Sequence, residues 1–106
     1  MKRRIAPSVL GFDHANMRGK VAELVAAGAD LIHFDVMDGQ FVPPITFGHQ
    51  LIHGLRDLGS TFFEVHLMTL TPDRHFKTFA DAGCQRAIFH AEVTAQIAAG
   101  RDAAMK

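Results

Sequence analysis

Two histidines and an aspartate are placed in the sequence so that their side chains could bind a metal ion or one another. His33 and Asp35 lie two residues apart in the segment Leu31–Met37. His66 lies in a second segment of the same kind, Phe62–Met68. Both segments are rich in β-branched, aromatic and aliphatic residues, which is typical of strands. Side chains alternate between the faces of a strand, so two neighbouring strands in register would bring the three polar side chains together.

This arrangement allows two interpretations when the residues are taken alone. A histidine and an aspartate two apart on one strand can form a hydrogen-bonded pair. With His66 on the matching face, the three side chains can also form a site for Zn²⁺ or Fe²⁺, with Mn²⁺ or Co²⁺ as further options. Met37 and Met68 share these faces, and methionines there would ordinarily fill a core.

Four strand–helix alternations are expected to position these residues. The predicted strands are Ile5–Leu10, Leu31–Met37, Phe62–Met68 and Arg86–Glu92. The predicted helices are residues 13–27, 49–58, 71–83 and 94–106. Regular alternation of this kind indicates βαβ units, which cross over right-handed and give a parallel sheet.

A parallel sheet is covered either by helices on both faces or by closure into a barrel. The polar and methionine-bearing face of the two central strands favours a barrel interior with a site at its C-terminal rim. Four units are half of a (βα)₈ barrel, so residues 1–106 are predicted to form one domain, an α/β (βα)₄ half-barrel. Its sheet edges and open concave face would be exposed, which predicts completion by self-association into a homo-oligomer.

Composition narrows the class of protein. Eleven basic residues balance eleven acidic ones, which argues against nucleic-acid or anionic-membrane partners. The single cysteine, Cys84, excludes an intramolecular disulfide and fits a reducing compartment. No apolar run approaches the roughly 18–20 residues that span a bilayer. A cytoplasmic location is therefore expected.

The remaining histidines are expected to have lesser roles. His90 and Glu92 share a face of the last predicted strand, and we expect a structural or rim role for them. The other four are expected at the surface: His14, His49, His53 and His75. Asp38 and Gly39 are expected to shape the turn after the second strand.

Three motifs resemble the ribulose-phosphate 3-epimerase family, in its N-terminal half. They are Ala6-Pro7-Ser8, the run from His33 to Pro43 (HFDVMDGQFVP), and Glu64-Val65-His66-Leu67-Met68. The resemblance covers the chain from about Ile5 to Glu92. Allulose-6-phosphate 3-epimerases are similar in the same motifs.

The resemblance implies an isomerase of carbohydrate metabolism, in the pentose phosphate pathway. In such enzymes a divalent metal at the barrel mouth polarises a ketose phosphate, and two aspartates exchange the proton at C3. By position, His33, Asp35 and His66 would be metal ligands, and Asp35 would also be an acid/base. The residues implied to contact the substrate are Ser8, Met37, His66 and Met68.

The chain also departs from the family pattern. The family's second aspartate, also a metal ligand, and its phosphate-binding loops belong to the second half of the barrel. Pro44 stands where the family usually has Asn. We therefore expect little or no turnover from this chain alone. Three hypotheses remain open: an epimerase half that needs a partner, a non-catalytic self-assembling half-barrel with or without a bound metal, and a piece of a longer protein.

Overall fold

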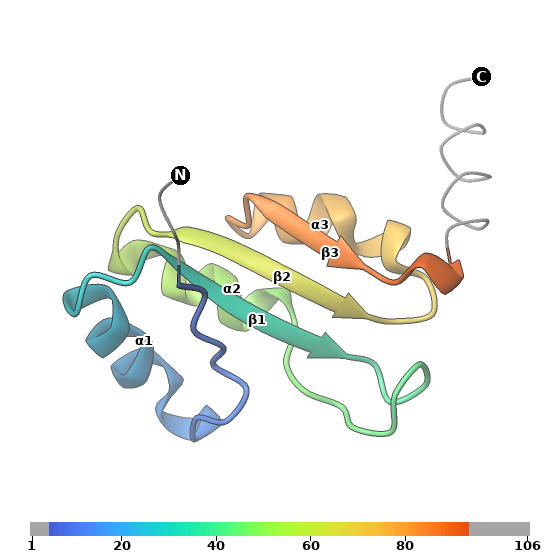
Figure 1. Cartoon of the computed structure of the whole chain (residues 1–106), viewed down its shortest axis with the longest axis horizontal. Helices are drawn as coiled ribbons and strands as arrows, with labels where there is room; N and C mark the ends of the chain where they lie inside the picture. Colours follow the sequence, from blue (N-terminus) through green and yellow to red (C-terminus); the bar gives the residue numbers. More distant parts are fainter. Residues whose placement is uncertain (1–4, 94–106) are drawn as a thin grey trace.

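The computed structural model describes residues 5–93 and contains a parallel three-stranded sheet. The strands are β1 (Leu31–Met37), β2 (Phe62–Met68) and β3 (Arg86–Phe89), in the spatial order β1-β2-β3. All three point the same way (Figure 1). The connection from β1 to β2 runs through α2 (His49–Leu55), and the connection from β2 to β3 through α3 (Phe76–Asp81). This is the predicted α/β architecture.

The α-helices are shorter than predicted, because part of each predicted helix is a 3-10 turn, which precedes α1 and α3 and follows α2. The remaining helical elements are η1 (His14–Asn16), α1 (Met17–Ala26), η2 (Arg56–Leu58), η3 (Pro72–His75) and η4 (Ala91–Val93). The helix predicted over residues 94–106 lies outside the described residues. None of the described helices is long and apolar enough to cross a membrane.

The first and last predicted strands are wrong in extent. Between residues 5 and 10 the chain forms only an isolated parallel bridge, from Ser8 to His33 of β1. His33 N donates to Pro7 O at 2.9 Å, and Val9 N donates to His33 O at 3.2 Å. Pro7 has no N–H to extend this ladder towards Leu31. At the other end, β3 stops at Phe89 rather than at Glu92.

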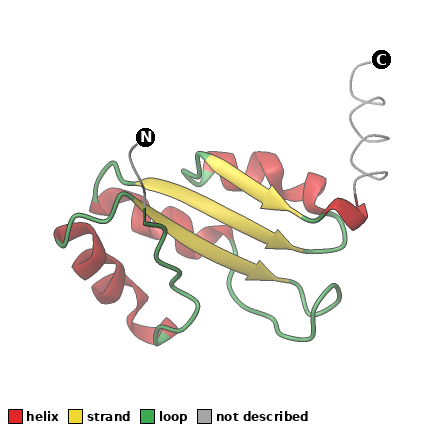
Figure 2. Cartoon of the chain, viewed as in Figure 1, coloured by secondary structure: helices red, strands yellow, loops and turns green. Residues whose placement is uncertain are grey.

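The hydrophobic core lies between the sheet and the helices, on one face of β1 and β2. The helices α2 and α3 lie behind the sheet in Figure 2. Alternate strand residues point into this layer and are fully or almost fully buried, as the alternation predicts: Ile32, Phe34, Val36, Phe63, Val65 and Leu67. Ile52 of α2 and Phe79 of α3 belong to the same cluster.

Arg56 ties together the segments that lead into β2 and β3. Its guanidinium donates hydrogen bonds to the carbonyl oxygens of Gly59, Thr61 and Gly83. It also lies 3.8 Å from the centre of the Phe63 ring, which adds a cation–π contact. Gly83 has φ 111°, and a Cβ there would lie 2.4 Å from Arg56 Cδ. Glycine is therefore required for this close approach.

Candidate functional site

The register of β1 and β2 brings the predicted site residues together. Asp35 lies opposite His66, and His33 lies opposite Glu64. Asp35 Oδ1 is 3.0 Å from His33 Nε2 and 3.0 Å from His66 Nδ1. The predicted convergence is therefore present, on the sheet face that is opposite to the helices.

Asp35 is the centre of this cluster. One carboxylate oxygen, Oδ1, faces both histidines, and the other, Oδ2, accepts a hydrogen bond from Ser8 Oγ at 2.8 Å. Burial alone would raise the pKa of Asp35, but hydrogen bonds from Ser8, His33 and His66 outweigh burial and lower that pKa. The carboxylate is thus held ionised, which is the form that binds a cation.

His33 is held from both sides of its ring. Its Nδ1 is hydrogen-bonded to Glu64, and its Nε2 faces Asp35. Burial lowers the pKa of His33, but the hydrogen bonds to Glu64 and Asp35 raise this pKa by more than burial lowers it. The net shift is therefore upward. With Nδ1 engaged by a carboxylate, Nε2 is the nitrogen that points into the cluster.

Strand alternation places Glu64 on the same face of β2 as His66, but its contacts were not predicted. Glu64 is only 6% exposed, and its Oε2 accepts from Arg86 Nε of β3 at 2.6 Å. Burial raises the pKa of Glu64, whereas hydrogen bonds from His33 and Arg86 lower it, and the net shift is downward. Arg86 was not predicted to belong to the site. The signal for it was its place on the strand next to Glu64, once the register is known.

His90 is another neighbour of the site. We predicted only a structural role or a position at the rim for it. It follows β3 directly, and its Nε2 lies 2.9 Å from His66 Nε2. The predicted turn at Asp38 and Gly39 is confirmed: Asp38 Oδ1 accepts from the amides of Gln40 and Phe41, and Gly39 has φ 74°. This turn begins the loop that leaves the C-terminal end of β1 (Figure 2).

Met37 and Met68 lie opposite each other in the register, at the C-terminal ends of β1 and β2. Strand alternation puts them on the same face as Asp35 and His66. Met68 is buried and Met37 half-buried. They are therefore the apolar neighbours of the cluster on the side of the strand ends.

The donor atoms of the cluster fit a divalent metal ion. Each of His33, Asp35 and His66 offers one ligand atom, and the three atoms lie within 4.8 Å of one another. Within the described residues, this is the group that could hold a metal. Two nitrogens and one carboxylate oxygen suit a catalytic site that leaves coordination positions open.

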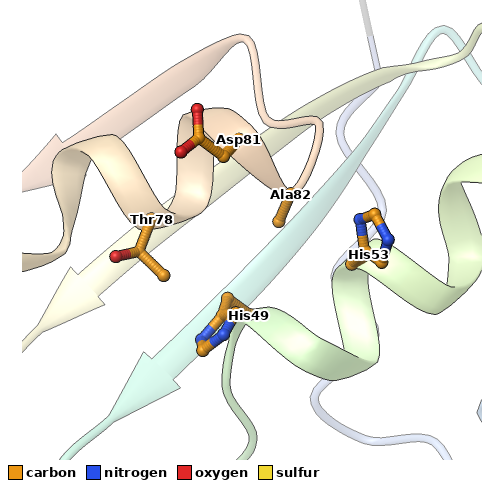
Figure 3. Close-up of a pocket in the computed structure, with 5 residues that line it drawn as sticks. All are labelled: His49, His53, Thr78, Asp81 and Ala82. Atoms are coloured by element: carbon orange, nitrogen blue, oxygen red, sulfur yellow. The ribbon is translucent and has the colours of Figure 1, made fainter.

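A hollow of about 310 Å³ lies between α2 and α3 on the helical layer (Figure 3). It is lined by His49, His53, Thr78, Asp81 and Ala82. The two histidines are exposed, as predicted for surface residues. Among the described residues they form no metal-binding group with a carboxylate. This hollow is therefore a weaker candidate for a metal site than the sheet face.

Known proteins match most of this chain. A model of the "Ribulose-phosphate 3 epimerase family" matches residues 4–101. The ribulose-phosphate 3-epimerase of Escherichia coli (strain K12) is 43% identical over 94 residues, which are 88% of this chain and 42% of that protein. The Bacillus subtilis (strain 168) ribulose-phosphate 3-epimerase is 42% identical over 89 residues, which are 84% of this chain and 41% of that protein. The chain thus spans about two fifths of the length of these curated relatives.

Proposed function

The chain belongs to the ribulose-phosphate 3-epimerase family, and from this premise we propose that it carries the metal-binding half of an active site for C3 epimerisation of a ketose phosphate. The observation that carries the proposal is the meeting of His33 Nε2, Asp35 Oδ1 and His66 Nδ1. A three-stranded α/β unit that covers two fifths of its relatives fits half of a (βα)₈ barrel.

The two carboxylate oxygens of Asp35 have different roles in the proposed chemistry. When bound by His33, Asp35 and His66, a divalent ion supplies positive charge next to the oxygen anion that develops as the C3 proton leaves. Oδ1 faces the histidines, so Oδ2 is the oxygen that we assign to the proton. Ser8 Oγ, which donates to Oδ2 at 2.8 Å, holds the carboxylate in this orientation.

The site is proposed to be incomplete in this chain alone. By the resemblance, the second proton-carrying aspartate and the phosphate-binding loops belong to the other half of the barrel. A twofold homodimer would place β2 of the partner where that aspartate is expected. The inward residues of β2 are Glu64, His66 and Met68, and none of them is an aspartate. Self-association would therefore restore the shape of a barrel without the second proton carrier.

Complementation tests this proposal. The 106-residue chain is assayed for ribulose-5-phosphate 3-epimerisation with Zn²⁺ or Mn²⁺, alone and after mixing with the separately expressed C-terminal part of the Escherichia coli relative. We expect no turnover alone, turnover in the mixture, and none in a mixture with Asp35→Asn. Turnover by the chain alone at the rate of full-length relatives would contradict the need for a second half. A mixture that assembles but stays inactive would contradict the epimerase assignment.

A second candidate function is a self-assembling half-barrel without catalysis, and the exposed edge of the sheet favours it. Among the described strands, β3 has one neighbour only, and its residues Ile88 and Phe89 are each 39% exposed. An unpaired edge with apolar side chains favours pairing with another chain. Native mass spectrometry reports subunit number and bound metal together. A metal-free oligomer would support this candidate, whereas a metal-bound chain that turns over substrate in the complementation mixture would support the epimerase half.

A further inference from the structure

His90 lies where it can fix the orientation of His66. The residue directly follows β3, and its Nε2 is 2.9 Å from His66 Nε2. The two rings are nearly parallel, with centroids 5.0 Å apart and planes inclined by 22°. A hydrogen bond between the two Nε2 atoms restricts rotation of the His66 ring about its last side-chain bond. This contact acts on Nε2 of His66, whereas Nδ1 faces Asp35.

His90 is itself held by its surroundings. The Phe41 ring lies 4.9 Å from the His90 ring, centre to centre. Phe41 stands in the turn that Asp38 stabilises, because Asp38 Oδ1 accepts from the Phe41 amide at 2.8 Å. Glu92 Oε2 lies 3.8 Å from His90 Nδ1, and the His90 side chain is 34% exposed. The ring is therefore fixed by packing, with one nitrogen towards His66 and the other towards a carboxylate.

We propose that His90 is a positioning residue for metal binding, which holds the His66 ring so that Nδ1 faces the Asp35 oxygen. This inference rests on the proposed metal site of His33, Asp35 and His66. Nothing in the resemblance assigned a role to His90 or Glu92. Glu64 stands in the same relation to His33: it is hydrogen-bonded to Nδ1, the outer nitrogen, and leaves Nε2 facing the cluster. Each histidine ligand then has its own outer partner, as metal-binding histidines usually do.

The contact between the two Nε2 atoms also couples the proton positions of both rings. One nitrogen must donate and the other must accept, since a neutral imidazole carries a single N–H. A His66 ring that binds a metal through Nδ1 keeps its proton on Nε2. His90 must then accept through Nε2 and carry its own proton on Nδ1, on the side of Glu92. This arrangement gives the proposal a spectroscopic signature.

Zn²⁺ affinity of the full 106-residue chain tests the proposal by substitution. His90→Phe keeps an aromatic ring but removes the acceptor, and we expect Zn²⁺ binding about 10–100-fold weaker. His90→Gln restores an acceptor at a similar reach and is expected to recover most of the affinity. His49→Phe removes an exposed histidine outside the cluster and should leave the affinity unchanged. Wild-type affinity in a folded His90→Phe protein would overturn the proposal.

NMR of the ring nitrogens in the Zn²⁺-loaded wild-type protein gives a test that depends on no variant. We expect the proton of His66 on Nε2 and the proton of His90 on Nδ1. A His90 ring that carries its proton on Nε2 in the loaded protein would overturn the inference and leave the proposed function intact. If the wild-type chain binds no Zn²⁺, the proposed metal site fails, and the inference fails with it.

Discussion

The two faces of the β1–β2 pair differ completely, although the same two seven-residue strands build both of them. The face towards the helices consists of apolar side chains that are almost entirely buried, such as Phe34 and Val65. The opposite face carries His33, Asp35, Glu64 and His66, which are joined by hydrogen bonds to one another and to Ser8 of the N-terminal segment. Adjacent residues of one strand therefore belong to opposite environments.

This difference indicates that stability and chemistry are separated residue by residue along each strand. Burial of apolar area is the main favourable term in folding, and the helical face supplies it. The polar face buries charged groups, which stabilise little or nothing once desolvation is counted. Substitutions on the two faces should accordingly change different measured quantities.

The largest expected effect is on the helical face. Phe34→Ala should lower the free energy of unfolding by about 3–5 kcal/mol, because it leaves a cavity under a fully buried ring. Urea denaturation measures this loss. Phe89→Ala is the matched control, since Phe89 is partly exposed at the sheet edge and should lose less. Equal losses for the two variants would show that the core is not concentrated under β1 and β2.

Asp35→Asn should affect binding rather than folding. Zn²⁺ affinity, measured by calorimetric titration, is expected to fall at least ~100-fold, since removal of a ligand charge exceeds the usual effect of an outer-shell change. Stability should change by about 1 kcal/mol or less, because the amide oxygen can still accept from Ser8. A loss of stability as large as that of Phe34→Ala would break the distinction between the faces.

Glu64→Gln should show a mixed effect, because Glu64 is a buried residue of the polar face. We expect the free energy of unfolding to fall by about 1–3 kcal/mol, since hydrogen bonds from His33 and Arg86 lose a charged acceptor. Zn²⁺ affinity should also fall, because His33 loses its outer partner. Asp81→Asn neutralises an exposed carboxylate of α3 that pairs with Lys77, and it should leave both quantities unchanged. Unchanged stability and unchanged Zn²⁺ affinity in Glu64→Gln would mean that the ion pair of Glu64 with Arg86 has no structural role.

The smallest expected effect is a pH dependence of stability in the metal-free protein. The lowered pKa values of Asp35 and Glu64 contribute stability above their unfolded values of about 4, and this stability is lost as the pH falls through the folded values. The raised pKa of His33 contributes below about 6.5, and its share is lost as the pH rises through the folded value.

The polar face should therefore contribute most in a window between about pH 4 and 6.5. Thermal unfolding with a chelator present, at a series of pH values, measures this window. The double variant Asp35→Asn with Glu64→Gln should flatten the profile. A wild-type profile of the same shape as that of the double variant would assign the pH dependence to other groups.

Much of the site could be predicted because strand alternation is a strong signal. The bounds of β1 and β2 and the meeting of His33, Asp35 and His66 are as the sequence indicated. Contacts that depend on the register were not predictable in the same way. The pairing of Glu64 with both His33 and Arg86 requires knowledge of which residues lie opposite each other.

The ends of the sheet were predicted less well, for local reasons. Apolar character between residues 5 and 10 suggested a strand, but Pro7 lacks the amide hydrogen that a longer ladder needs. The last strand was predicted to continue to Glu92, whereas β3 ends at Phe89, one residue before His90. The His90 ring lies against the His66 ring, and this contact could not be predicted without the register.

The Arg56 guanidinium affects the geometry of the site although it lies outside the cluster, where the strands begin. It holds carbonyl oxygens just before β2 and just before β3, and so it sets where both strands start relative to each other. A slip of one residue in either strand would exchange its inward and outward side chains. The relative position of His33, Asp35 and His66 thus depends on a side chain that contacts none of them.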